Sequence, residues 1–233
     1  MGNYDFSPES PSSFEQRSIC CFVVDVSFSM SGNPMRELNK GLKEFHNEIL
    51  EDSLTSNRLE VAIVEFGSDV SVRLKPSLPN DFSLPQLRVK GSTRMVDGVQ
   101  EAISLVESRK DWYRDQGIPY LRPWIILITD GAPDDDQDVQ MLSEQIENLT
   151  KNKKLVFIPI GVEGADMDIL NMISGYSSRE GNWMKMPAMK LQGLKFSDFF
   201  KWVSASMAIV AGSKEEDKIN LPDPSDWMQG FTI

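Results

Sequence analysis

Two aspartates stand where oxygen ligands of a metal ion are expected. Asp25 and Asp130 each follow a short, continuous apolar run, residues 19–24 and 124–129, of the kind that forms a strand buried on both faces of a parallel sheet. Ligands of open α/β sheets sit in the crevice outside the carboxyl ends of the strands. Carboxylates buried there are costly unless a positive charge neutralises them, and a hard divalent cation prefers oxygen ligands. The two aspartates therefore predict a cation site.

Hydroxyl groups extend this predicted ligand set. Ser27 and Ser29 follow Asp25 at alternate positions, so a curling loop can direct both hydroxyls to one point, and Thr93 precedes a predicted helix in the segment Gly-Ser-Thr. Two carboxylates roughly neutralise one divalent ion, while hydroxyls and waters complete an octahedral shell. We expect one ion at Asp25, Ser27, Ser29, Thr93 and Asp130. Mg²⁺ is the first expectation, with Mn²⁺ and Ca²⁺ as alternatives.

The elements that must position these residues follow one another as strand and helix. This alternation predicts an α/β fold with a mostly parallel sheet and helices on both faces. The segment after the turn at 67–69 is expected to return as an antiparallel edge strand. The predicted strands are 19–24, 59–66, 70–74, 124–129, 155–160 and 183–186, and the predicted helices begin near 33, 95, 139, 167 and 196.

The length of 233 residues and a hydrophobic content of 40% suit one well-buried domain with appended segments. We expect a flexible N-terminal arm over 1–16, the domain over 17–210 and an acidic C-terminal tail over 211–233. The tail is interpreted as mobile or as a docking segment. Trp227 and Phe231 are expected to anchor it, either on its own domain or on a partner.

Charge and cysteine content limit the function classes. The net charge of −11, without a run of basic residues, argues against nucleic acid and anionic membranes as partners. No apolar run approaches the roughly 20 residues that span a bilayer, and residues 1–13 do not resemble a secretion signal. Cys20 and Cys21 are adjacent and are not expected to pair with each other. Together these features predict a cytoplasmic protein.

The metal-site residues also carry a family resemblance. The segment from Asp25 to Ser29 matches the Asp-x-Ser-x-Ser element of von Willebrand factor A (vWA) domains, and Thr93 and Thr129-Asp130-Gly131 match the other two metal-site segments in order. The resemblance covers roughly residues 17–210. It implies a three-layer α/β/α, Rossmann-like fold with a metal-ion-dependent adhesion site (MIDAS). In such domains an acidic side chain of a protein partner completes the coordination of the ion.

One position departs from the family pattern. The family usually has glycine in the middle of its first element, and Phe28 stands there in this chain. The metal ligands are retained, but a bulky residue beside the ion changes what can approach it.

A narrower resemblance concerns the closing helix. Phe199 to Ser206, with the preceding Phe196-Ser197-Asp198, is similar to the closing helix of the bacterial TerY-like branch, which is linked to tellurite and other stress resistance. The resemblance implies an intracellular stress-response adaptor. It also implies partnership with a protein kinase and a PP2C-type phosphatase.

Two other function classes remain as alternatives. A phosphoryl-transfer enzyme would use Asp25 with a divalent metal, but a haloacid-dehalogenase-like phosphatase needs a second aspartate where Ser27 stands. A receiver domain would need a lysine near the end of strand 155–160, which closes in Pro-Ile-Gly. An extracellular adhesin is the second alternative, and the lack of a signal peptide argues against it. We therefore expect no enzymatic activity.

The remaining polar residues have ordinary structural interpretations. Asp134, Asp135, Asp136 and Asp138 suit a solvated helix start, because carboxylates favour the positive end of the helix dipole. The alternative is an electrostatic rim that repels acidic partners or recruits a second cation. His46, the only histidine, lies within a predicted helix and is assigned no catalytic role.

Overall fold

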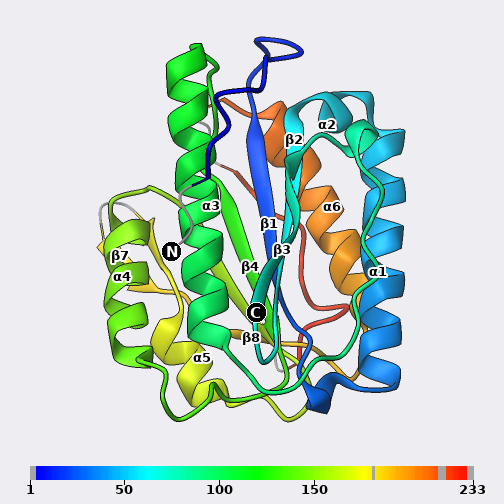
Figure 1. Cartoon of the computed structure of the whole chain (residues 1–233), viewed down its shortest axis with the longest axis vertical. Coiled ribbons are helices and arrows are strands. Elements are labelled where there is room, and N and C mark those ends of the chain that lie inside the picture. The colour runs from blue at the N-terminus through cyan, green and yellow to red at the C-terminus, as the bar shows by residue number, and fades with distance from the viewer. Residues whose placement is uncertain (1–3, 180–181, 215–218, 230–233) are drawn as a thin grey trace.

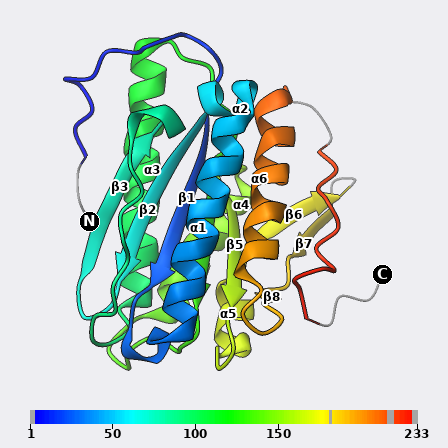
Figure 2. The same ribbon diagram turned by 90° about the vertical axis from the view of Figure 1, so that its right-hand side faces the viewer.

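The computed structural model describes residues 4–179, 182–214 and 219–229. A six-stranded sheet lies between two helical layers (Figures 1 and 2). The strand order is β3-β2-β1-β4-β5-β8, in which only the β2–β3 pair is antiparallel. This confirms the predicted three-layer fold with one antiparallel edge strand. The strands of this sheet are β1 (Ser18–Asp25), β2 (Leu59–Phe66), β3 (Val70–Ser77), β4 (Trp124–Thr129), β5 (Val156–Gly161) and β8 (Met189–Lys190).

Helices α1 and α6 cover one face of the sheet, and α3, α4 and α5 cover the other (Figure 2). Strand β1 serves both cores because its side chains alternate between the two faces. Phe22 packs against Phe45 of α1 and Phe200 of α6, with ring centroids 5.2 and 5.4 Å apart, whereas Val23 belongs to the opposite core. The helices are α1 (Asn33–Glu51), α2 (Ser53–Arg58), α3 (Met95–Gln116), α4 (Val139–Lys151), α5 (Met167–Ile173) and α6 (Phe196–Gly212), with short 3₁₀ turns at Phe28–Met30 and Pro79–Asp81.

The last strand of the sheet is not the one expected from the sequence. The predicted strand 183–186 corresponds to β7 (Asn182–Lys185), which pairs only with β6 (Tyr176–Arg179) in a separate two-stranded hairpin. The sheet ends instead with β8, which pairs with β5 through Ile160 and Gly161. A strand of two residues is too short to show a periodic pattern, so no pattern in the sequence predicts it.

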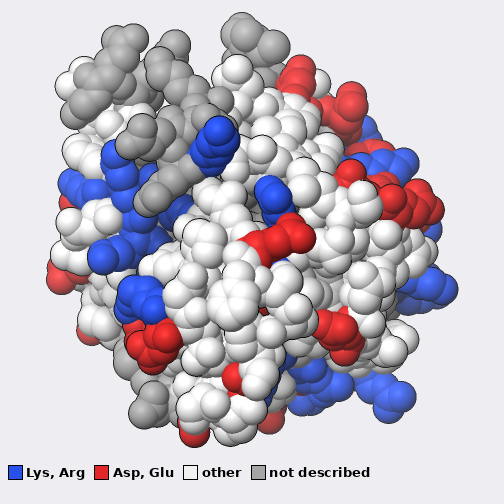
Figure 3. Space-filling model, turned by 90° about the horizontal axis from the view of Figure 1, so that it is seen from above, with Lys and Arg blue, Asp and Glu red and all other residues white. Residues whose placement is uncertain are grey.

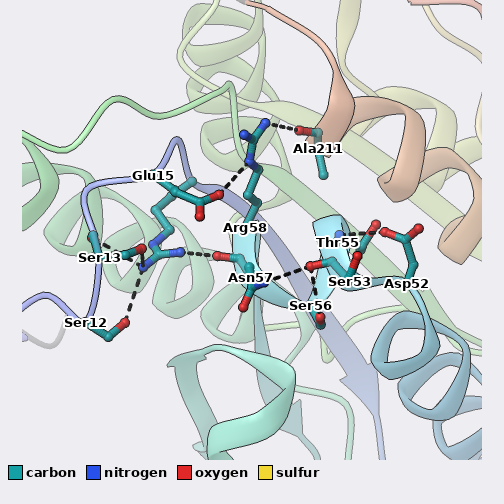
Figure 4. A network of polar contacts seen from close by, with 11 residues as sticks. Ser12, Ser13, Glu15, Asp52, Ser53, Thr55, Ser56, Asn57, Arg58 and Ala211 are labelled. Carbon is teal, nitrogen blue, oxygen red and sulfur yellow. Dashed lines mark hydrogen bonds and ion pairs between the residues drawn. The ribbon is translucent and has the colours of Figure 1, made fainter.

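The described part of the N-terminal arm lies against the domain. Phe6 is buried, and the guanidinium of Arg109 lies 4.9 Å from its ring centroid. Arg109 also forms an ion pair of 2.6 Å with Glu9. Farther along, Arg58 donates hydrogen bonds to the carboxylate of Glu15 and to the carbonyl of Ala211 at the end of α6 (Figure 4). Cation–π and ion-pair contacts thus connect residues 6–15 to the domain.

The described part of the C-terminal tail also packs on its own domain. Trp227 is only 1% exposed, and its ring centroid lies 5.0 Å from that of Phe199 and 5.3 Å from that of Trp202. An antiparallel bridge joins Met228 to Leu191. Trp227 therefore anchors the tail on the domain itself, the first of the two expected alternatives. Phe231, the other expected anchor, lies outside the described residues.

The amino ends of the parallel strands form one pole of the molecule, where basic side chains gather on one side (Figure 3). The exposed Lys153 and Lys154 precede β5, and the exposed Arg122 precedes β4. The register of these strands, Trp124 opposite Val156, brings Arg122 and Lys154 to neighbouring positions. Arg122 is far from these lysines in the sequence, and the sheet brings it near them.

None of the described helices has both the length and the apolar character needed to cross a membrane.

Candidate metal centre

Asp25 occupies the carboxyl end of the central strand β1 and is fully buried. Its Oδ1 accepts a hydrogen bond of 2.8 Å from the backbone N–H of Ser27. Its Oδ2 accepts one of 2.5 Å from the hydroxyl of Thr129, the last residue of β4. Because β1 and β4 are parallel neighbours, their carboxyl ends meet at the same edge of the sheet. The strand ends therefore fix the first predicted ligand.

The loop after β1 brings two predicted hydroxyl ligands together. The 3₁₀ turn Phe28–Met30 curls the chain so that the hydroxyl oxygens of Ser27 and Ser29 lie 2.9 Å apart. The Ser29 hydroxyl donates a hydrogen bond of 2.7 Å to Oδ1 of Asp130, directly after β4. Asp25, Ser27, Ser29 and Asp130 thus form one cluster of oxygen atoms, although the two segments are about 100 residues apart in the chain.

Thr93 reaches the same edge from the segment that precedes α3. Its backbone N–H donates to Oδ1 of Asp134 at 3.1 Å, and its carbonyl accepts from the N–H of Asp134 at the same distance. A β-carbon placed on Gly131 would lie 3.7 Å from the hydroxyl oxygen of Thr93 and 3.9 Å from Oδ2 of Asp25. The Thr93 hydroxyl and the Asp25 carboxylate therefore border the same small space. All five residues predicted as ligands come together at this edge.

The electrostatics of the cluster favour a cation. Burial raises the pKa of Asp25 to about 6, against the lowering effect of the hydrogen bonds from Ser27 and Thr129. Burial also raises the pKa of Asp130, against the hydrogen bond from Ser29. Both carboxylates lack a positive partner in the described hydrogen bonds and ion pairs of this site. A divalent cation would offset the cost of keeping two nearby carboxylates ionised.

The donor set indicates which class of ion fits. Within the described ranges, no three His, Cys, Asp or Glu side chains are grouped so as to hold a metal. Coordination here therefore depends on the hydroxyls of Ser27, Ser29 and Thr93 in addition to the two carboxylates. An all-oxygen set with few protein carboxylates suits a hard divalent cation that retains several waters. The residues present thus fit a hard divalent cation.

Two residues support the centre in ways that the sequence did not predict. The sequence motif includes Thr129 without assigning it a role, and in the structure its buried hydroxyl donates to the carboxylate of Asp25. Glu65, near the end of β2, is 1% exposed and accepts from Nζ of Lys90 at 2.6 Å. The backbone N–H of Lys90 in turn donates to the carbonyl of Val26 at 2.5 Å. A charged residue within the apolar strand LEVAIVEF was the available signal for Glu65.

The acidic residues after Asp130 are largely engaged within the domain. Asp134 accepts from the N–H of Thr93, Asp136 pairs with Arg94 at 2.6 Å, and Asp138 caps α4 by accepting from the N–H of Met141. These contacts favour the structural interpretation of the run over a second cation site. Asp135 is exposed.

The other residues considered have packing roles. His46 lies 4.7 Å from the ring of Phe82 in a stacked arrangement, and its Nε2 lies 2.9 Å from the carbonyl oxygen of Pro79. Cys20 and Cys21 are free and fully buried in β1. Phe28, by contrast, is 71% exposed.

The fold is shared with proteins of known structure. One is proximal thread matrix protein 1 from the mussel byssus, with a zinc-occupied MIDAS motif (19% identity, TM-score 0.54, covering 82% of this chain and 46% of that one). Another is the pilus adhesin SpaC of Lactobacillus rhamnosus GG (14% identity, TM-score 0.62, covering 82% of this chain and 30% of that one). A third is the PilB minor pilin of Streptococcus sanguinis (15% identity, TM-score 0.54, covering 88% of this chain and 65% of that one). The present chain spans less than two thirds of the length of each. At these identities the likeness shows the fold alone.

Among curated proteins, none matches the chain. The family model described as von Willebrand factor type A domain matches residues 20–195, which is more than half of the sequence. This stretch begins within β1 and includes all five clustered residues, from Asp25 to Asp130. The chain therefore belongs to the von Willebrand factor type A domain family.

Proposed function

We propose that this protein is a metal-dependent protein–protein interaction module without catalytic turnover. The observation that carries the proposal is the joining of Asp25, Ser27, Ser29 and Asp130 through short hydrogen bonds at the carboxyl edge of the sheet. These oxygens, with Thr93, would hold the ion from the protein side. The bound ion would supply an electrophilic position, and an acidic side chain of the partner would fill it. Mg²⁺ is the ion proposed, with Mn²⁺ and Ca²⁺ as alternatives.

The chemistry of the site supports binding over turnover. The polar groups that face Asp25 are hydroxyl and backbone donors, from Ser27 and Thr129. A phosphoryl-transfer enzyme would need a positive side chain to stabilise the transferred group. The two basic residues that flank Thr93 in the chain are already paired, Lys90 with Glu65 and Arg94 with Asp97 and Asp136. If Asp25 were a catalytic group, the purified protein would release phosphate from a generic phosphate ester in an Asp25-dependent manner, and we expect none.

The biological setting is a finer proposal. The closing helix α6, with its sequence similar to the TerY-like branch, supports a bacterial, cytoplasmic stress-response or tellurite-resistance adaptor that works with a kinase and a PP2C-type phosphatase. The pilus proteins that share the fold favour the competing setting, an extracellular adhesin. Cell fractionation separates the two: the adaptor is expected in the cytoplasm, whereas recovery from the cell surface would contradict it.

The function itself is tested by metal-dependent capture of a partner. Tagged wild-type protein is incubated with lysate in Mg²⁺ or in EDTA, beside Asp25→Ala and the matched control Asp135→Ala. The control removes an exposed carboxylate from the neighbouring acidic run. Wild type and Asp135→Ala are expected to retain the same protein in Mg²⁺ and to lose it in EDTA, whereas Asp25→Ala should retain none. Equal capture by Asp25→Ala would overturn the proposal.

A further inference from the structure

Phe28 is the most exposed of the large hydrophobic residues in the described parts of the chain, with 71% of its surface accessible. Single exposed apolar side chains are common on protein surfaces. Exposure alone therefore assigns no role. What distinguishes Phe28 is its position between Ser27 and Ser29, the two residues whose hydroxyls converge on the metal centre.

The backbone around Phe28 is held in place. Its N–H donates to the carbonyl of Gly91 at 3.0 Å, and its carbonyl accepts from the N–H of Ser31 at 3.1 Å. Met30, two residues later, is fully buried and fixes the turn against the core. The hydrogen-bonded backbone of this turn therefore keeps the side chain of Phe28 at the surface. A side chain presented on a fixed backbone loses less conformational entropy when a partner covers it.

Phe28 is also the direct neighbour in the chain of both serines of the centre, Ser27 and Ser29. Neighbouring Cα atoms are about 3.8 Å apart. The Cα of Phe28 therefore lies at about that distance from the Cα atoms of Ser27 and Ser29, whose hydroxyls are the candidate metal ligands. A partner that places a carboxylate on the ion must pass its adjacent residues over the same loop. Three charged groups of the loops nearby are engaged within the domain, Lys90 with Glu65, Asp134 with the N–H of Thr93 and Asp136 with Arg94. An apolar side chain can therefore approach the ring without stranding those charges.

We infer that Phe28 is a specificity-determining residue, which selects partner segments that carry an apolar side chain within two residues of the acidic group that binds the ion. The inference rests on the proposed function, since it assumes that the ion receives a partner carboxylate. Phe28 does not bind the ion itself. Its contribution is contact with the neighbouring residue of the partner, and burying a Phe side chain is enough to change affinity by about tenfold.

The test uses a displayed peptide library with a fixed central Glu and three randomised positions on each side, selected on the 233-residue chain in Mg²⁺. Two further selections test the proposed function. A library with Gln at the centre tests whether binding needs the carboxylate, and a selection in EDTA tests whether it needs the metal. The variants are Phe28→Ser, which removes the ring, and Phe28→Leu, which keeps an apolar side chain. Phe14→Ser is the matched control, because Phe14 is 67% exposed but precedes the opposite end of β1. A metal-induced rise in melting temperature first verifies that each variant retains the centre.

Wild type, Phe28→Leu and Phe14→Ser are expected to enrich apolar residues within two positions of Glu, and Phe28→Ser to lose that enrichment while still requiring Glu and Mg²⁺. Selection of Glu without an apolar neighbour by wild type, or an unchanged preference in Phe28→Ser, would overturn the inference and leave the proposed function standing. Absence of any selection that depends on both Glu and Mg²⁺ would instead overturn the proposed function, and the inference with it.

Discussion

The hydroxyl of Ser29 donates a hydrogen bond of 2.7 Å to Oδ1 of Asp130, across about 100 residues of sequence. This contact joins the loop after β1 to the loop after β4 at the candidate metal position. Its effect on metal binding can be separated from its effect on folding, because Ser29 itself is exposed.

Replacement of Ser29 by Ala should weaken metal binding and lower the stability of the metal-free protein only moderately. Loss of a ligand or of its supporting hydrogen bond typically lowers metal affinity by about 10- to 100-fold, whereas this part-buried hydrogen bond to a carboxylate contributes about 1.5 kcal/mol to stability. Calorimetric titration of Mg²⁺ or Mn²⁺ measures the first effect and urea denaturation of the metal-free protein the second. Ser31→Ala, an exposed serine after the same turn, serves as the control. Equal metal affinity of Ser29→Ala and wild type would contradict the assignment of this ligand.

The stability of the metal-free protein should depend on pH through Asp25. Burial raises the pKa of this carboxyl from 3.8 to about 6 in the folded state. The folded state therefore binds the proton more tightly than the unfolded state, so the group increases stability as pH falls through about 6 and reaches its full effect below 3.8. Melting temperatures in EDTA should rise from about pH 7.5 to about pH 5 more steeply for wild type than for Asp25→Asn, which cannot titrate at this position. If the melting temperatures of wild type and Asp25→Asn change equally with pH, titration of Asp25 is not the cause of the pH dependence.

Metal binding should have the opposite pH dependence. The ion needs ionised carboxylates, so protons compete with it at Asp25 and Asp130, whose pKa values are both raised by burial. The rise in melting temperature on adding about 1 mM Mg²⁺ should be larger at about pH 7.5 than at about pH 5. A shift that grows toward acid pH would be inconsistent with carboxylate ligands.

The Glu65–Lys90 ion pair should act as a positioning contact for the centre. Glu65 is 1% exposed, and Lys90 donates its backbone N–H to Val26, next to Asp25. Glu65→Ala leaves both Lys90 and Arg73 without this partner and should cost about 2 kcal/mol of stability, less than a fully buried pair because Lys90 is 37% and Arg73 35% exposed. It should also lower metal affinity, since the segment leading to Thr93 loses this anchor. Glu147→Ala, which breaks the exposed pair with Lys151, should change neither by a comparable amount. Unchanged metal affinity in Glu65→Ala would show that Glu65 contributes to stability only and does not position the metal centre.

The C-terminal tail should contribute to stability through Trp227. Truncation of a buried Trp to Ala typically costs about 3–5 kcal/mol, and Trp227 packs against Phe199 and Trp202 of α6. Urea denaturation should show a loss of that size for Trp227→Ala and a loss of under about 1 kcal/mol for Trp183→Ala, which is 38% exposed in β7. Equal effects of the two substitutions would show that the tail does not stabilise the domain.

The main strands and the candidate site could be predicted from the sequence because both depend on local, strongly patterned features. Apolar runs that end in Asp25 and Asp130 predict buried parallel strands, and parallel strands bring their carboxyl ends to one edge. The hydrogen bond of Thr129 to Asp25 has no such pattern. It depends on the relative register of β1 and β4, which pairs Val24 with Ile128 and is fixed only in the assembled sheet.

The missed features at the C-terminal side have the same origin. Strand β8 consists of Met189 and Lys190 alone, and its place beside β5 is set by tertiary packing rather than by an alternating pattern. Whether Trp227 would bind its own domain or a partner could not be read from a polar segment. The answer depends on the space between Trp202 and Phe199, which only the folded α6 creates.

A crystal structure of the protein with Mn²⁺, with anomalous diffraction measured, tests the central claim most directly. We expect one anomalous peak at the carboxyl edge of the sheet, bonded at about 2.1 Å to hydroxyl oxygens of the clustered residues, with Asp25 and Asp130 facing it directly or through water. Ser27 and Ser29 should both be ligands. A peak at another place, or none at this edge when Mn²⁺ is in excess, would contradict the account.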